Sequence, residues 1–135
     1  LEDGISKMIE ADYTPLGMTL SSHDYHFLFA KLPTSCIAWQ LVKTDMGFEN
    51  SSSEIQSLIE KGYVPVGISI MEQLFYTLLV NTDEFVAENY SIVCYSTNNT
   101  VELQTAIDKE ISNNMLPMGY LETGDSITIL YINWK

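Results

Sequence analysis

The chain carries one short pattern three times: a segment with an apolar stripe, then a proline, one intervening residue and a glycine. The three pairs are Pro15/Gly17, Pro65/Gly67 and Pro117/Gly119. Successive pairs lie 50 and 52 residues apart, and a period of that size is typical of chains built from copies of one supersecondary unit. We therefore expect the 135 residues to form a single domain of three pseudo-repeats, spanning about 1–43, 44–97 and 98–135.

Each proline is preceded by a segment with helical periodicity, the first being residues 3–12. Ser51 and Glu54 have the spacing of a capping box before the second segment, and residues 98–100 open the third. We expect the apolar residues, three or four positions apart, to lie on one buried face of each helix. These residues are Ile5, Met8 and Ile9; Ile55, Leu58 and Ile59; and Leu103, Ile107 and Ile111.

Proline ends each helix because it lacks an amide hydrogen and disfavours helical geometry in the residue before it. Alternating strands follow in pairs. The second strand of each pair is expected at 25–31, 74–81 and 126–133, with further strands at 36–43 and 90–96. Each unit is then strand, helix, strand, strand, and the first unit lacks its leading strand, which would lie before Leu1. The expected fold class is α+β, mostly antiparallel sheet with helices on one side.

A family likeness appears at the second proline. The segment Lys61-Gly-Tyr-Val-Pro-Val-Gly67 resembles the Gly-Trp-x-Pro-x-Gly-Gly signature of short uncharacterised bacterial domains, with Tyr63 in the place of tryptophan. The first copy has Asp12 for the leading glycine, and the second copy has Ile68 for the final one. The resemblance implies a strand–helix–hairpin unit and a bacterial source. It implies no activity, because that family has none assigned.

The second strand of each pair is apolar on both faces, so water is not expected on either. Three helices can cover only one face, and the other needs a second sheet, a second subunit or a ligand, because an open apolar face promotes association. We therefore expect a homo-oligomer. A glycine at a fixed strand position permits close approach of another backbone, marks a bulge, or allows tight helix–sheet packing. Packing is favoured over contact with a ligand.

The charge of the chain excludes one class of function. Eighteen acidic residues face six lysines and no arginine, which gives a net charge of −12. That field repels phosphate, and nucleic-acid binding is therefore not expected. Solubility accounts for the charge; the alternative function is an acidic inhibitor or immunity-type protein that neutralises a basic protein partner. No apolar run reaches the roughly 18 residues that span a bilayer, so we expect a cytoplasmic protein without membrane contact.

Residues typical of catalytic or metal sites cluster only at His23, Asp24 and His26. On a strand the two histidines point to opposite faces, and they converge only if the segment is a turn. A polar hairpin tip is the preferred interpretation. Cys36 and Cys94 belong to no CxxC motif; we expect buried free thiols, with a disulfide as the alternative if their strands are neighbours. The sequence predicts no enzyme, no metal and no cofactor.

Aromatic residues on the expected strands are the remaining candidates for a site, since rings with a polar tip suit interfaces and planar ligands alike. The favoured function is a non-catalytic binding or interaction module, homo-oligomeric, with a small ligand between repeats or subunits as a variant. The candidate ligand or interface residues are Tyr25, His26, Trp39, Tyr76, Tyr95 and Trp134.

Overall fold

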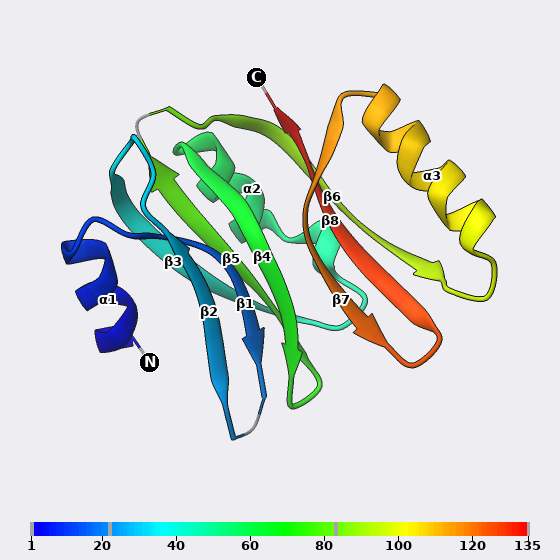
Figure 1. Cartoon of the computed structure of the whole chain (residues 1–135), viewed down its shortest axis with the longest axis horizontal. Helices are drawn as coiled ribbons and strands as arrows, with labels where there is room; N and C mark the ends of the chain where they lie inside the picture. The colour runs from blue at the N-terminus through cyan, green and yellow to red at the C-terminus, as the bar shows by residue number, and fades with distance from the viewer. Residues whose placement is uncertain (1, 22, 83, 135) are drawn as a thin grey trace.

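The computed structural model describes residues 2–21, 23–82 and 84–134, without the side chains of residues 51 and 134. This part of the chain is α+β, with three α-helices, a short 3₁₀ helix and eight strands (Figure 1). The helices are α1 (Glu2–Glu10), η1 (Glu49–Ser51), α2 (Ser53–Glu60) and α3 (Thr100–Ser112). The strands are β1 (Thr14–Leu20), β2 (Tyr25–Ala30), β3 (Cys36–Asp45), β4 (Tyr63–Met71), β5 (Leu74–Thr82), β6 (Ala87–Ser96), β7 (Met115–Thr123) and β8 (Ser126–Trp134).

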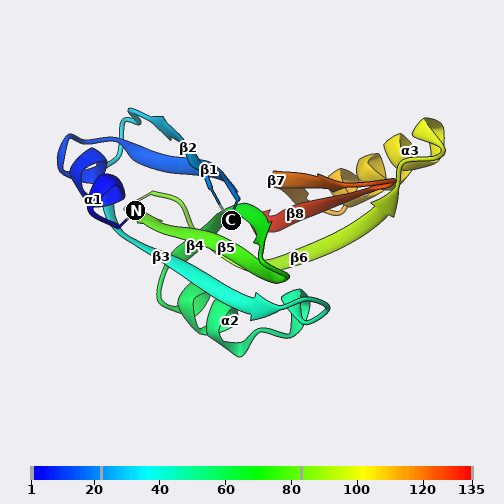
Figure 2. The ribbon, with the colours of Figure 1, turned by 90° about the horizontal axis from the view of Figure 1, so that it is seen from below.

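The strands form three sheets, and all the strand pairs within them are antiparallel. Their strand orders are β1-β2, β3-β5-β4 and β6-β8-β7. In the second and third sheets, the strand that precedes the helix pairs with the second strand of the hairpin that follows it. Figure 2 shows α2 on one side of the middle sheet and the hairpin β1–β2 on the other. The three first strands β1, β4 and β7 meet at the centre, with β4 contacting both of the others.

Each helix is followed by a residue in the left-handed backbone conformation. These residues are Asp12 (φ 71°), Gly62 (φ 97°) and Asn114 (φ 65°). After α1, the Tyr13 amide donates to the Met8 carbonyl (3.0 Å) and the Asp12 amide to the Ile9 carbonyl (2.9 Å), which is a Schellman-type helix end. Glycine adopts this conformation at least cost, and Asp and Asn tolerate it, so Asp12 can stand where the second copy has glycine.

The three hairpins share one register. In each, the proline pairs with a bulky residue of the second strand, the glycine pairs with a leucine, and a β-bulge separates the two pairs. The proline therefore occupies the same register position in all three hairpins. The glycine–leucine pairs are Gly17–Leu28, Gly67–Leu78 and Gly119–Leu130.

Two details of the helices differ from the sequence expectation. The cap of α2 is Ser52, whose hydroxyl accepts the Ile55 amide (3.3 Å), whereas Ser51 belongs to η1. The stripe expected on α3 is not buried: Ile111 is 44% exposed, and the other two residues of the stripe are half-buried. The reason is that α3 packs mainly on one edge strand, β7, which offers too little surface to cover three turns. No helix in the described part of the chain is long and apolar enough to cross a membrane.

The hydrophobic core is built on the middle strands β5 and β8. Leu78, Leu79, Leu130 and Tyr131 are 0% exposed, and neighbours along a strand point to opposite faces, so both faces of these strands are covered within one chain. Each such aliphatic side chain contributes about 1.5–3 kcal/mol. In the corresponding strand of the first hairpin, β2, no residue is buried, and Leu28 is 65% exposed. Among the three hairpins, the uncovered apolar surface therefore lies on the first.

Candidate functional site

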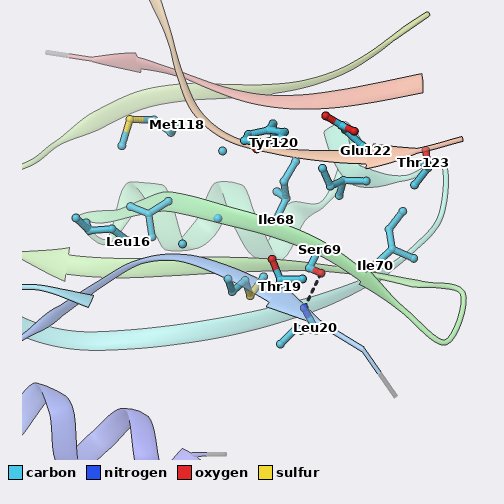
Figure 3. Close-up of a pocket in the computed structure, with 16 residues that line it drawn as sticks. Leu16, Thr19, Leu20, Ile68, Ser69, Ile70, Met118, Tyr120, Glu122 and Thr123 are labelled. Atoms are coloured by element: carbon cyan, nitrogen blue, oxygen red, sulfur yellow. Dashed lines mark hydrogen bonds between the residues drawn. The ribbon is translucent and has the colours of Figure 1, made fainter. Parts of the chain in front are cut away.

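A groove of about 760 Å³ runs along the first strands of the three hairpins (Figure 3). The strand β4 lies between β1 and β7, as the close-up shows, and forms the floor of the groove. The lining consists of residues 16–20 of β1, 66–70 of β4 and 118–123 of β7. The groove therefore exists only because three segments, about 50 residues apart in sequence, are brought together by the fold.

Glycine lets these three strands approach one another. A β-carbon on Gly67 would lie 3.3 Å from both the Cα of Gly17 and the amide nitrogen of Met18. One on Gly119 would lie 3.4 Å from the Cα of Gly67. Backbone atoms cannot move aside as a side chain can, so a side chain at Gly67 would force the strands apart. Close backbone approach, together with a bulge, thus accounts for the glycines.

One hydrogen bond joins the floor of the groove to a wall. The Leu20 amide of β1 donates to Oγ of Ser69 on β4 over 3.0 Å, as Figure 3 shows. Apart from Ser69, the polar groups of the lining are few: Thr19 on one wall, and Tyr120, Glu122 and Thr123 on the other. Tyr120 is 66% exposed. Most of the lining residues are aliphatic, but polar and apolar atoms contribute about equally to the exposed surface of the groove.

The groove contains few groups for acid–base chemistry. Its lining contains one carboxylate, Glu122, one phenol, Tyr120, and no histidine or cysteine. Nowhere in the described ranges do three His, Cys, Asp or Glu side chains lie close enough to hold a metal ion. A groove with both aliphatic and polar groups in its lining is able to bind a molecule or a polypeptide.

The groups with a shifted pKa lie outside the groove. Burial raises the pKa of the Cys36 thiol and of the Tyr90 hydroxyl. Burial is also the main cause of the raised pKa of Tyr131, followed by its hydrogen bond with Tyr95 (2.9 Å between the hydroxyl oxygens) and the charge of Glu110. All three shifts favour the neutral form, so none of them creates a nucleophile or base at neutral pH.

The aromatic candidates chosen from the sequence are distributed over all three sheets. Tyr25 and His26 are exposed at the start of β2, Tyr25 by 49%. Trp39 on β3 and Tyr76 on β5 are half-buried and pack against the hydrophobic core. These four residues therefore do not form one site, and none of them lines the groove.

The two remaining candidates belong to the third sheet. Tyr95 is half-buried on β6, and its hydroxyl is bonded to that of Tyr131 across the pair β6–β8. Trp134 ends β8, and its side chain lies outside the described residues. Tyr95 stabilises a neighbouring strand and does not reach the groove.

The histidines and cysteines also stay apart. His23 and His26 are both exposed near the turn between β1 and β2, where the Ser21 hydroxyl accepts the Asp24 amide (2.9 Å). Cys36 and Cys94 are free thiols on different sheets. Cys36 is half-buried, but the expectation of a buried thiol is wrong for Cys94, which is exposed because β6 is an edge strand.

A second, smaller cavity of about 200 Å³ lies between the hairpins. Apolar side chains from β1, β4, β5 and β7 line it, together with Thr14. Thr14 is 1% exposed, and its Oγ1 has no hydrogen-bond partner among the described residues. A buried hydroxyl without a partner costs about 1–3 kcal/mol. The walls of the cavity are nevertheless apolar, because this hydroxyl is not exposed to it.

The residues that sequence reasoning missed are the polar ones of the groove: Thr19, Ser69 and Tyr120. Nothing in their local sequence distinguishes them from other strand residues. The available signal was the recurring glycine, which predicted that something approaches the strand closely at that point. The approaching groups are the other two glycine-bearing strands, and polar residues near the glycines become the edges of the groove.

Comparison with known proteins gives no match: no family model, no curated protein and no solved structure is similar to this chain. The groove, the smaller cavity and the exposed first hairpin are therefore the features on which a function can be based.

Proposed function

We propose that the chain is a non-catalytic binding or interaction module, built of three pseudo-repeats and assembled as a homo-oligomer, with the groove over β4 as its main binding surface. The observation that carries the proposal is the groove itself, which aliphatic side chains and polar groups line in about equal area and which holds no histidine or cysteine. The common register of the three hairpins supports their origin as copies of one unit.

The exposed apolar side chains support association. Leu28 on β2 is 65% exposed and Tyr120 on β7 is 66% exposed, and exposed apolar side chains are candidates for contact with a partner. Tyr120 stands on a wall of the groove, where an aromatic ring with a polar tip contributes strongly to contact with a partner.

Native mass spectrometry and sedimentation of protein from its own host test the proposal. The expected result is a mass above that of one chain, or a retained molecule, and a loss of either in Tyr120→Ser. The matched control is Val101→Ser, because Val101 is equally apolar and 73% exposed but lies on α3, away from the groove. A single chain that carries nothing, and that behaves the same after Tyr120→Ser, would contradict the proposal.

The smaller cavity favours a variant of this function, in which a small ligand binds between the repeats. A volume of about 200 Å³ and apolar walls suit an apolar single-ring molecule. In a thermal-shift titration, benzene should stabilise the protein more than phenol does, because phenol would bury its hydroxyl without a partner. An equal or larger effect of phenol would count against the cavity as the site.

The charge favours the alternative of a different class, an acidic protein that neutralises a basic partner. Of the acidic residues in the described part of the chain, all but Glu49 and Glu110 are exposed, so the net charge of −12 is presented to solvent. Binding of such a partner should weaken steeply as the salt concentration rises, because screened charges attract less. Oligomerisation or ligand binding through the groove should depend little on salt.

A further inference from the structure

The hairpins pack on one another in chain order: the second rests on the first, and the third rests on the second. The first hairpin has no such neighbour among the described residues. The face of the second hairpin that carries Gly67 rests on the backbone of β1, and the face of the third that carries Gly119 rests on the backbone of β4. The corresponding face of the first hairpin rests on nothing: within 4 Å of a β-carbon on Gly17, the only atom found among the described residues is the Cβ of Leu28, in the same hairpin.

The leucines opposite the glycines show the consequence. Residues paired across two antiparallel strands lie on the same face, so each leucine shares the face of its glycine. Leu78 and Leu130 are 0% exposed, whereas Leu28, in the same register position, is 65% exposed. The same side chain is thus buried wherever a neighbouring strand covers its face, and it is open on the first hairpin.

A polar group is also repeated on this face. Ser69, two residues after Gly67, accepts the Leu20 amide of the strand on which the second hairpin rests. Thr19 stands two residues after Gly17, pairs with His26 as Ser69 pairs with Tyr76, and is exposed. The first hairpin therefore presents a bare glycine, an apolar side chain and a hydroxyl in the arrangement that elsewhere holds a strand.

We propose that the face of the first hairpin formed by Gly17, Thr19 and Leu28 binds an extended segment of a partner protein, in which aliphatic residues stand two positions apart. This proposal rests on the binding function proposed above and names the class of partner. The chemistry of the segment follows from the two contacts already made, since the strands that receive them read Leu16-Gly17-Met18 and Val66-Gly67-Ile68. The contact would continue an interface that the chain itself makes twice.

The geometry fixes what each group does. The backbone of the segment lies over Gly17, whose bare face lets the two backbones come as close as those of β1 and β4. An aliphatic residue of the segment covers Leu28, and Thr19 Oγ1 accepts an amide of the segment, as Ser69 does for Leu20.

A fluorescent peptide provides the test. The probe, called the glycine peptide, is Val-Pro-Val-Gly-Ile-Ser-Ile, the sequence of residues 64–70, flanked by lysines for solubility. The control peptide has serine in place of the two aliphatic residues beside the glycine. In an anisotropy titration against the full chain, the glycine peptide should bind at least tenfold more tightly than the serine peptide. Equal binding of the two peptides, or no binding of either, would overturn the proposal.

Two pairs of chain variants locate the contact. Leu28→Glu should weaken binding of the glycine peptide at least tenfold, whereas Ile37→Glu, at a site that is 60% exposed on β3, should not. Gly17→Ala should weaken it as well, and Gly4→Ala in α1 should leave it unchanged, because nothing lies within 4 Å of that site. Circular dichroism of each variant shows whether it is folded. Leu28 and Ile37 are both exposed, so neither replacement is expected to unfold the chain.

The outcomes also separate this proposal from the proposed function. If the chain self-associates and Leu28→Glu abolishes the association without any peptide binding, the face is an interface between copies; the partner segment is then wrong, and the binding function stands. If self-association, ligand retention and peptide binding are all absent, both proposals fail.

Discussion

Gly67 and Gly17 occupy the same position in two hairpins and pack backbone against backbone. A β-carbon on Gly67 would lie 3.3 Å from the Gly17 Cα, whereas a β-carbon on Gly17 would meet only the Leu28 Cβ, at 3.8 Å. The contact is therefore directional: one glycine needs its bare face, and the other supplies the backbone that fills it. This relationship makes the three sheets one structure and gives the groove its floor and walls.

Replacement of these two glycines should have unequal effects on stability. Gly67→Ala forces a methyl group against backbone and should lower the free energy of unfolding by about 1–3 kcal/mol. Gly17→Ala meets an ordinary contact distance and should change it by no more than about 0.5 kcal/mol. Urea unfolding followed by circular dichroism measures both. Equal losses would show that the glycine contact does not hold β1 and β4 together.

The leucines paired with the glycines should differ in the same sense. Leu78→Ala removes a fully buried side chain and should cost about 2–5 kcal/mol, because it leaves a cavity in the core. Leu28→Ala removes a side chain that is 65% exposed and should cost about 0.5 kcal/mol or less. Denaturation midpoints of the two variants decide the point. A large loss for Leu28→Ala would mean that the first hairpin is covered in solution.

Asn50 in η1 joins the segment before α2 to β6, an edge strand of the third sheet. Its Nδ2 donates to the Ile92 carbonyl and its Oδ1 accepts the Ile92 amide, each over 2.6 Å. Asn50→Asp loses the donor and places a carboxylate beside a carbonyl, so unfolding should become easier by about 1–3 kcal/mol. Asn98→Asp, in the exposed segment before α3, is the matched control and should be nearly neutral. Thermal melts of both variants test this, and equal melting temperatures would exclude the pairing as a stabilising contact.

The raised pKa of Tyr131 should make the protein lose stability at alkaline pH. Above about pH 10, the ordinary value for tyrosine, the unfolded chain releases this proton while the folded chain keeps it. The folded state then binds more protons, so its stability falls as the pH rises, whereas below that value Tyr131 contributes no pH dependence. Urea midpoints at about pH 8 and pH 11 measure the fall. Tyr131→Phe should show a smaller fall, with a remainder from Tyr90, whose pKa is raised in the same direction. An identical fall in the variant would contradict the assignment.

The turn between β4 and β5 is a place where the sequence does not match the backbone. Glu72 (φ 54°) and Gln73 (φ 67°) are both left-handed, a conformation that hairpin turns usually assign to Asn-Gly. The double replacement Glu72→Asn, Gln73→Gly should therefore raise stability by about 0.5–1 kcal/mol. The converse change, Gly124→Ala at φ 57° in the turn after β7, should lower it. Differential scanning calorimetry compares the melting temperatures, and a stabilised Gly124→Ala would argue against these turn conformations.

Much of the local structure followed from the sequence, because the signals for it are local. Proline after an apolar stripe ended each helix, and the alternation after it indicated each hairpin, with strand bounds close to those observed. The errors have tertiary causes. Ile111 is exposed because α3 packs on a single edge strand, and Cys94 is exposed because β6 lies at the edge of its sheet.

The candidate site was less accessible from the sequence. Six residues were chosen for their chemistry, and the fold places the five described ones on three sheets without bringing any of them into the groove. Tyr120 and Thr19 have no such local mark. They line the same groove only because the hairpins stack, and stacking depends on backbone distances that a pattern of residue types does not contain.

The sequence by itself determined where each hairpin lies and where its glycine falls, since period, proline and alternation act within a few residues. Only the tertiary structure decided that the glycines meet one another, that the strands divide into three sheets, and that one of three equivalent leucines stays exposed. The physical reason is that burial depends on neighbours distant in the chain. Leu28 and Leu78 have the same register position, and they differ only in what lies against their face.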